Sequence, residues 1–186
     1  MKILTIPGSL RKGSYNRKLI ALANESLARS GVEVDAIDLK EFPMPPYDGD
    51  LEDTEGLPDA AAKLQARVAT AHGIILASPE YNSGIPGTLK NVIDWTTRGS
   101  NPWSGKVVGL MGATPNEWGT TRMMPSLRQV FSNLGALVIP QQVNIRRAGE
   151  VWNESGELLD AKARERVENF VGKFLDYAGR LRQDKS

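Results

Sequence analysis

Residues 2–16 read KILTIPGSLRKGSYN, an apolar segment followed by a loop rich in glycine and hydroxyl residues. The apolar pattern of Lys2–Pro7 predicts a buried β-strand. A helix is expected to begin near Tyr15 or Asn16 and to stop at Gly31, a residue suited to a left-handed C-cap. A loop that joins a strand end to a helix start presents free backbone N–H groups and the positive end of the helix dipole. The stretch therefore predicts an α/β fold with an anion site after its first strand.

The side chains of this loop suit a phosphate group. Ser9, Ser14 and Asn16 carry hydrogen-bond donors, and Arg11 adds a planar positive group that matches phosphate oxygens. The alternative is a capped helix start, with Ser14 or Asn16 as N-cap and the basic residues solvated.

Two known phosphate loops do not fit the spacing. Gly8 and Gly13 match the first and sixth positions of a Walker A loop, but Ser14 stands where that motif requires Lys. The dinucleotide pattern G-x-G-x-x-G fails because position 10 is Leu. A monophosphate loop rich in hydroxyl groups remains.

Outward from this loop, short apolar segments alternate with longer segments of helical period, a pattern typical of a parallel sheet covered on both faces. Further strands are predicted at Val32–Leu39, Gly73–Ser78, Lys106–Gly112 and Ala136–Pro140. Further helices are predicted at Pro58–Ala71, from Pro86 or Gly87 onward, at Thr121–Leu134 and at Asp160–Leu181. The result is a single three-layer α/β/α domain over residues 1–186, with a five-stranded parallel sheet. The Pro-rich segment Glu41–Gly56 is expected to be a long loop, either functional or a plain surface connection.

The composition narrows the class of protein. Of 186 residues, 40% are hydrophobic and 24% charged, with a formal net charge of +1, so no basic surface for nucleic acid is expected. The N-terminus lacks a signal-peptide pattern, and no apolar run reaches the roughly 18 residues of a membrane span. A cytoplasmic protein without a membrane partner is expected. Because there is no Cys, any redox chemistry would need a cofactor.

A second stretch follows the third predicted strand: residues 78–94 read SPEYNSGIPGTLKNVID. It contains P-E-Y-N and P-x-x-L-K-N-x-x-D, while residues 8–16 contain G-S-x-R-x-x-S-x-N. On these motifs the chain resembles the NADPH-dependent FMN reductases, a flavodoxin-like family that includes bacterial chromate, quinone and azo-dye reductases. Without the resemblance, Pro79–Gly87 could be a tight loop that only turns the chain toward the next helix.

The resemblance implies three loops around FMN. The phosphate would be held by Ser9, Arg11, Ser14 and Asn16. The flavin ring would lie along Pro79, Glu80, Tyr81 and Asn82. The third loop would approach the ring through Gly112, Ala113 and Thr114. These residue types make physical sense, because a flat ring needs a rigid apolar wall and its polar edge needs backbone donors and acceptors.

The third loop departs from the family pattern, since Asn116, Glu117 and Trp118 stand where small residues are usual. Access of an electron acceptor is therefore in doubt. Trp118 could line an acceptor pocket, form a subunit contact or be a partly buried packing residue.

The resemblance also implies a reaction: NADPH reduces the bound FMN, which then reduces a small acceptor such as a quinone, free flavin, azo compound or chromate. Such chemistry needs no metal and no acid or base side chain. A homodimer or homotetramer is implied, with Trp95 near the contact. His72, the only histidine, is expected to be structural, and Lys90 and Asp94 to form a surface ion pair.

Two other functions share this fold. An electron-carrier flavodoxin would lack a pyridine-nucleotide site, but such carriers resemble strongly acidic proteins with a Thr-rich phosphate loop, unlike this chain. A signalling or scaffold domain of the same topology would bind no FMN and would be colourless when purified.

Overall fold

The computed structural model describes residues 1–183 and has a central five-stranded sheet. All strand pairs are parallel, in the order β2-β1-β3-β4-β5. The strands are β1 (Lys2–Pro7), β2 (Glu33–Ala36), β3 (Gly73–Ala77), β4 (Val107–Ala113) and β5 (Leu137–Ile145). The predicted parallel sheet is confirmed.

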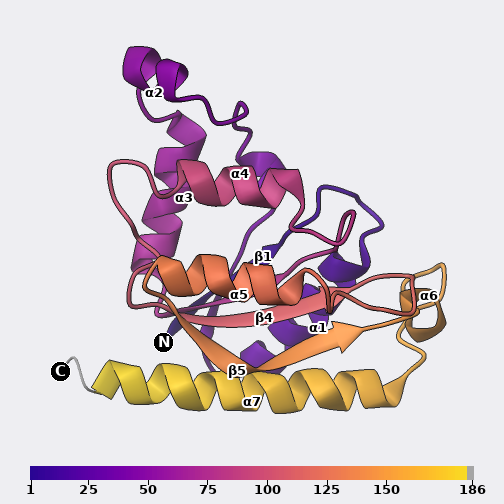
Figure 1. Ribbon diagram of the computed structural model, residues 1–186. Helices are drawn as coiled ribbons and strands as arrows, with labels where there is room; N and C mark the ends of the chain where they lie inside the picture. Colours follow the sequence, from indigo (N-terminus) through magenta and orange to yellow (C-terminus); the bar gives the residue numbers. More distant parts are fainter. Residues whose placement is uncertain (184–186) are drawn as a thin grey trace.

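Helices cover both faces of the sheet. One hydrophobic cluster joins α1 and α7 to one face, and a second joins α3, α4 and α5 to the other. These helices are α1 (Tyr15–Arg29), α3 (Asp59–Thr70), α4 (Gly87–Trp95), α5 (Met124–Asn133) and α7 (Ala161–Gln183). Figure 1 shows the sheet between α7 below and α4 and α5 above. The predicted flavodoxin-like three-layer arrangement is confirmed. Within residues 1–183, no helix combines the length and apolar character needed to cross a membrane.

Strand periodicity explains the two clusters. In β1, Ile3 belongs to the α1/α7 side and Leu4 to the opposite side, because successive side chains point to opposite faces. Both side chains are fully buried, and burial of one such side chain stabilises the fold by about 1.5–3 kcal/mol. On the α4/α5 side, Trp103 packs on Phe131 and its indole N–H donates to Thr96 Oγ1 at 3.0 Å.

From β1, the chain adds β2 on one side and then β3, β4 and β5 on the other, so the strand order changes direction between β1 and β3. Ligands of open α/β folds bind at this switch point. The Gly8 N–H donates to Ala77 O at 2.8 Å, so the loops after these two strands begin side by side. An added Cβ at Gly8 would lie only 3.2 Å from Leu89 Cδ2 and 3.3 Å from Ala77 O. This close approach favours glycine, because an added Cβ would push its neighbours aside by a few tenths of an ångström.

Several bounds differ from the prediction. The strand predicted at Val32–Leu39 is only β2 (Glu33–Ala36), and the helix predicted from Thr121 begins at Met124. Residues 41–56 were expected to be a loop, but they contain the end of a 3₁₀ helix, η1 (Leu39–Glu41), and a short helix, α2 (Gly49–Glu55). No residue of α2 is buried, so no apolar periodicity marks it in the sequence. The helix is capped instead by Asp48, whose carboxylate accepts the Asp50 N–H at 2.9 Å.

The last strand is longer than Ala136–Pro140, the predicted range. β5 continues to Ile145, with a register irregularity opposite Val108–Leu110. Pro140 is tolerated because it lies at this irregularity on an edge strand, where no ladder hydrogen bond is lost. A further short helix, α6 (Ala148–Val151), follows the strand.

Candidate functional site

The loop after β1 presents backbone donors. Among the described residues, the N–H groups of Ser9, Leu10 and Gly13 have no acceptor. Ser14 is the N-cap of α1, and its hydroxyl accepts the Asn16 N–H at 3.2 Å. Ser9 Oγ accepts the Arg11 N–H at 3.4 Å. Both hydroxyl oxygens thus act as acceptors, which leaves their own protons free for an anion at the helix N-terminus.

Arg11 and Arg17 have different roles in this loop. The Arg11 side chain is exposed, and its guanidinium has no partner within residues 1–183. Arg17 Nε donates to the Arg11 carbonyl at 3.0 Å, and Arg17 Nη2 lies 2.5 Å from Asp38 Oδ1. The hydrogen bond from Arg17 lowers the pKa of the Asp38 carboxyl. Arg17 therefore fixes the loop, while Arg11 remains available to a ligand.

Asn16 ties the first loop to the third. Its side-chain NH₂ donates to Ala113 O, and its Oδ1 accepts the Ala113 N–H, both at 2.9 Å. The side chain is 2% exposed. Since both ends of the amide bind Ala113, the structure gives Asn16 a positioning role beside the phosphate loop.

The loop after β3 forms a tight turn. The Tyr81 N–H donates to Gly84 O at 3.1 Å, and the Gly84 N–H donates back at 2.9 Å. Asn82 and Ser83, the two central residues, have φ of 50° and 63°, the left-handed values of a type I′ turn. The turn follows the buried Pro79 and leaves Tyr81 half exposed. It thus offers an aromatic side chain and a rigid backbone edge to a ligand.

The Glu80 side chain faces the third loop. Its Oε2 accepts the N–H groups of Arg122 and Met123 at 3.1 and 2.9 Å, at the start of α5. Arg122 Nη1 also donates to Ser83 Oγ at 3.3 Å. The Glu80 carboxylate is therefore used within the protein, and only its backbone is available to a ring that lies along residues 79–82.

The loop after β4 is held by its own contacts. Gly112, Ala113 and Thr114 are all buried. The Thr114 N–H donates to Ile145 O at 3.1 Å, and the Thr114 hydroxyl lies 2.9 Å from Gly119 O. These residues close one side of the site mainly through their backbone.

Trp118 is 58% exposed, so its interpretation as a packing residue is wrong. Its ring lies 4.7 Å from the guanidinium carbon of Arg122, a cation–π contact at the rim of the site. Trp95 has the opposite outcome, because its side chain is fully buried and its indole N–H donates to Pro45 O at 2.8 Å. Trp95 therefore packs within its own chain, and its position near a subunit contact stays a prediction.

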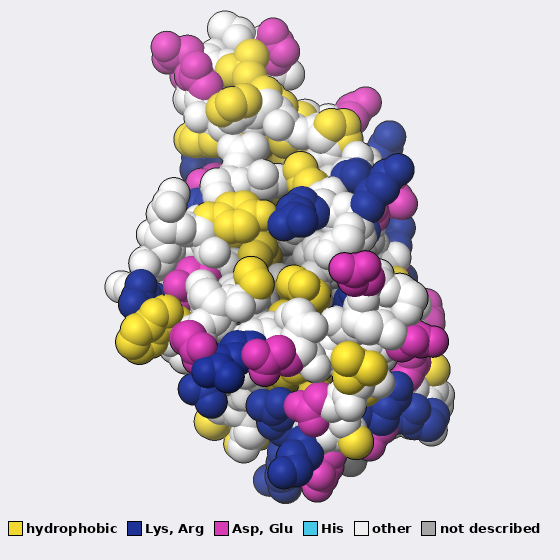
Figure 2. All heavy atoms as spheres, turned by 90° about the vertical axis from the view of Figure 1, so that its right-hand side faces the viewer, with side chains coloured by type: hydrophobic (Ala, Val, Ile, Leu, Met, Phe, Trp, Pro, Cys, Tyr) yellow, Lys and Arg dark blue, Asp and Glu magenta, His cyan; other side chains and the backbone are white. Residues whose placement is uncertain are grey.

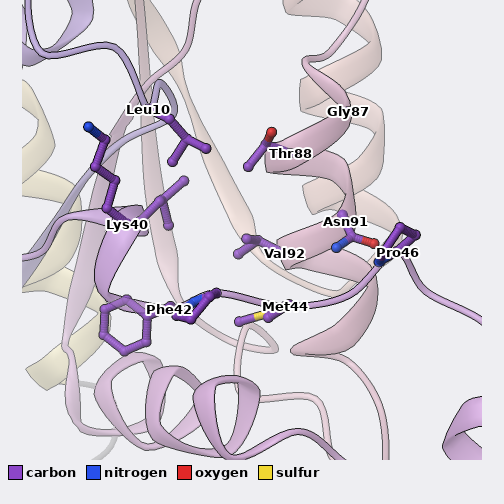
Figure 3. Close-up of a pocket in the computed structure, with 11 residues that line it drawn as sticks. Leu10, Lys40, Phe42, Met44, Pro46, Gly87, Thr88, Asn91 and Val92 are labelled. Carbon is purple, nitrogen blue, oxygen red and sulfur yellow. The ribbon is translucent and has the colours of Figure 1, made fainter.

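A pocket of about 840 Å³ adjoins these loops, and sequence reasoning did not find it (Figure 3). It lies between the phosphate loop, the segment after β2 and the first turns of α4. The lining is mostly apolar, and its main residues are Leu10, Leu39, Lys40, Phe42, Pro43, Met44, Pro46, Thr88, Asn91 and Val92. Figure 2 looks onto the side of the molecule where the strands end and shows hydrophobic side chains at the surface beside Lys and Arg.

The pocket wall is anchored by Asn91, a member of the second motif. Its Oδ1 accepts the Tyr47 N–H at 2.7 Å, and its NH₂ donates to Pro45 O at 2.8 Å. The two charged residues of that motif form a surface ion pair as predicted, with Lys90 Nζ 2.5 Å from Asp94 Oδ1. His72 is also structural as predicted, since its Nδ1 accepts the Lys2 N–H at 3.0 Å.

The residues present fit FMN. Free N–H groups, two hydroxyls and an unpaired guanidinium suit a phosphate monoester, and the half-exposed Tyr81 beside a rigid turn suits a flat ring. In the part of the chain that the structure describes, no group of three or more His, Cys, Asp or Glu residues could hold a metal ion.

Fold and site together define an oxidoreductase of the flavodoxin-like class. Residues 1–150 match the family model described as NADPH-dependent FMN reductase. The chain is 35% identical over 185 residues to an NAD(P)H-dependent FMN reductase of Pseudomonas aeruginosa, covering 98% of this chain and 97% of that protein. It is 30% identical over 186 residues to a quinone reductase of Escherichia coli K12, covering 98% and 97%.

Solved structures agree. The flavoenzyme FerB, an NAD(P)H:(acceptor) oxidoreductase of Paracoccus denitrificans, matches with a TM-score of 0.82 and 27% identity over 96% of this chain and 97% of that one. A flavodoxin from the Archaea matches with a TM-score of 0.67 at 12% identity, which shows the shared fold alone. The chain belongs to the NADPH-dependent FMN reductase family, so the predicted family, reductase activity and cofactors, FMN and NAD(P)H, are confirmed.

Proposed function

We propose that this chain is a cytoplasmic reductase that uses NADPH and bound FMN to reduce a small acceptor, with a quinone as the first candidate. The observation that carries the proposal is the juxtaposition of two loops. A loop with free N–H donors and an unpaired Arg11 follows β1, and a half-exposed Tyr81 on a rigid turn follows the neighbouring strand β3.

The proposed roles divide the named residues into two groups. Ser9, Ser14 and Arg11 bind the phosphate through their hydroxyl protons and guanidinium, together with the free N–H groups of the loop. The ring lies along Pro79–Asn82, with Tyr81 against its face and backbone N–H groups at its polar edge. Gly112, Ala113 and Thr114 close the third side.

The second group consists of positioning residues. Asn16 holds the third loop against the first, and Glu80 holds the second loop against the start of α5. FMN, when bound, supplies the hydride and electron transfer. The protein has to hold the ring edge, leave one face open and bring the nicotinamide within about 3–3.5 Å of it.

A homodimer or homotetramer is part of the proposal, because an open ring face on a small domain is readily completed by a neighbouring subunit. Light scattering at micromolar concentration measures the mass directly. A monomer mass would contradict this part alone and leave the reductase function untouched.

The experiment that tests the function is a visible absorption spectrum of the purified protein, before and after NADPH is added, followed by NADPH oxidation with a quinone. We expect flavin bands that bleach with NADPH, no metal requirement, and parallel double-reciprocal lines. Intersecting lines would contradict a site shared by nicotinamide and acceptor. Absence of FMN binding would contradict the whole proposal.

Arg11→Ala tests the placement of the phosphate. Loss of a hydrogen bond to a charged group costs about 1.5–3 kcal/mol, so the Kd for FMN should rise by roughly 10- to 150-fold while stability changes by about 0.5 kcal/mol or less. Lys12→Ala is the matched control and should change the Kd by only about two- to three-fold. If riboflavin, which has no phosphate, loses as much affinity as FMN in Arg11→Ala, the assignment is wrong.

A further inference from the structure

The pocket between the phosphate loop, residues 39–46 and α4 is lined by side chains that take no part in the proposed FMN contacts. Phe42 and Val92 are buried beneath it, and Leu10 is 39% exposed at its edge. Its volume of about 840 Å³ falls in the range of about 300–1,000 Å³ that is usual for small-molecule sites. Such a pocket suits a flat apolar group.

One cation stands among these apolar side chains. Lys40 lines the pocket, and its ammonium has no carboxylate within ion-pair distance among the described residues. Asp38, an acidic residue of the same segment, is already paired with Arg17 and accepts the Lys40 backbone N–H at 3.0 Å. Lys40 is therefore fixed at its backbone and free at its charged end.

Figure 3 shows how these groups face one another. Lys40 and Leu10 lie on one side of the pocket, with Thr88 and Val92 across from them and Phe42 at the lower edge. The Thr88 hydroxyl has no hydrogen-bond partner within residues 1–183. The Lys40 nitrogen lies at the rim beside Leu10, so the apolar space has one positive charge at its rim and one free hydroxyl across from it.

The walls do not depend on a ligand for their position. Asn91 and the Trp95 indole hold Pro45 from α4, and Arg17 joins the carbonyl of Arg11 to Asp38. These bonds connect all three walls. A preformed pocket loses little conformational entropy when it binds, so even a small ligand gains affinity there.

We propose that this pocket binds a flat aromatic organic anion, with its ring between Leu10, Phe42 and Val92 and its anionic group at the Lys40 ammonium. The anion can belong to a reducible acceptor, such as an aromatic sulfonate or carboxylate, or to the phosphorylated adenosine of NADPH. Binding of the anion in this pocket does not require that the anion be reduced. The assignment of the pocket as a subsite for the acceptor or for the nucleotide rests on the proposed function.

The test uses 8-anilinonaphthalene-1-sulfonate, a fluorescent aromatic anion that is not reduced, on the FMN-loaded and FMN-free protein. Fluorescence should rise on binding in both. Lys40→Met should raise the Kd by about two- to five-fold, the range of an exposed ion pair. Thr88→Phe, which fills the pocket from an exposed position, should weaken binding at least about ten-fold. Lys63→Met, the same change at an exposed position of α3, is the control.

Equal effects of Lys40→Met and Lys63→Met, or unchanged binding in Thr88→Phe, would overturn the proposal. So would absence of the fluorescence rise in the native oligomer, because a second copy would then cover the pocket. Displacement by 1,4-naphthoquinone-2-sulfonate identifies an acceptor subsite, and displacement by adenosine 2′,5′-bisphosphate a nucleotide subsite. The absorption of bound FMN in the same samples tests the proposed function separately.

Discussion

Asn16→Ala should destabilise the protein far more than an ordinary change at a helix start. The variant removes two hydrogen bonds of 2.9 Å and leaves both the N–H and the C=O of Ala113 without a partner. Ala113 is only 2% exposed, so water cannot replace these bonds. Each unsatisfied buried group costs about 1–3 kcal/mol, so the free energy of unfolding should fall by about 2–6 kcal/mol. With an m-value of about 2 kcal/mol/M, the urea midpoint should fall by about 1–3 M.

The same helix offers a matched control. Asn24 also lies in α1, but its side-chain oxygen is buried without a hydrogen-bond partner. Asn24→Ala therefore deletes the same atoms without orphaning a backbone group, and it should leave the urea midpoint unchanged or slightly raised, because Ala favours helix. Equal midpoints for the two variants would refute the positioning role of Asn16. In the folded fraction of Asn16→Ala, the Kd for FMN should also rise, since the first and third loops are no longer joined.

Two further predictions concern packing and pH. In Gly112→Ala, the new Cβ would lie 2.6 Å from Thr120 Cγ2, so we expect the free energy of unfolding, measured by urea denaturation, to fall by about 1–3 kcal/mol. Gly13→Ala is the control, because an added Cβ there meets nothing within 4 Å, and it should be neutral or slightly stabilising. Equal effects of the two variants would contradict the packing argument. The pKa of Asp38 is lowered by its hydrogen bond from Arg17, so this pair stabilises the fold above the unfolded pKa of about 3.9, and the contribution is lost as pH falls through the lower folded value. The stability difference between the wild type and Asp38→Asn should shrink below about pH 4, and a difference constant down to pH 2 would contradict it.

The parts of the fold that follow from local pattern could be predicted from the sequence. β1 was predicted at its observed bounds, and α1 began at one of the two expected residues, because apolar period and cap residues are local signals. The flavodoxin-like order followed from the alternation of strands and helices. α2 could not be predicted, since a helix without buried residues carries no apolar period.

The contacts that shape the site are non-local, which is why the sequence did not show them. Asn16 and Ala113 are 97 positions apart, and Asn91 lies 46 positions from Pro45. Each contact joins a side chain to a backbone group, and any residue type can supply a backbone group. No complementary residue therefore marks the partner in the sequence, and the pocket beside Asn91 was missed for the same reason.

Each of the two loop motifs contains residues that can bind a ligand and residues that hold the loop in place, and spacing alone does not separate the two roles. In the first loop, the Ser9 hydroxyl proton and the Arg11 guanidinium have no acceptor among the described residues, whereas the amide of Asn16 is used within the protein. In the second, the turn at Tyr81 is exposed, whereas the Glu80 carboxylate binds the start of α5. A ligand site on loops needs both, because donors bind well only when the loops that carry them are already held in place. Substitution of a free donor should therefore change affinity without stability, and substitution of a positioning residue should change both, which is the distinction that the Arg11 and Asn16 variants measure.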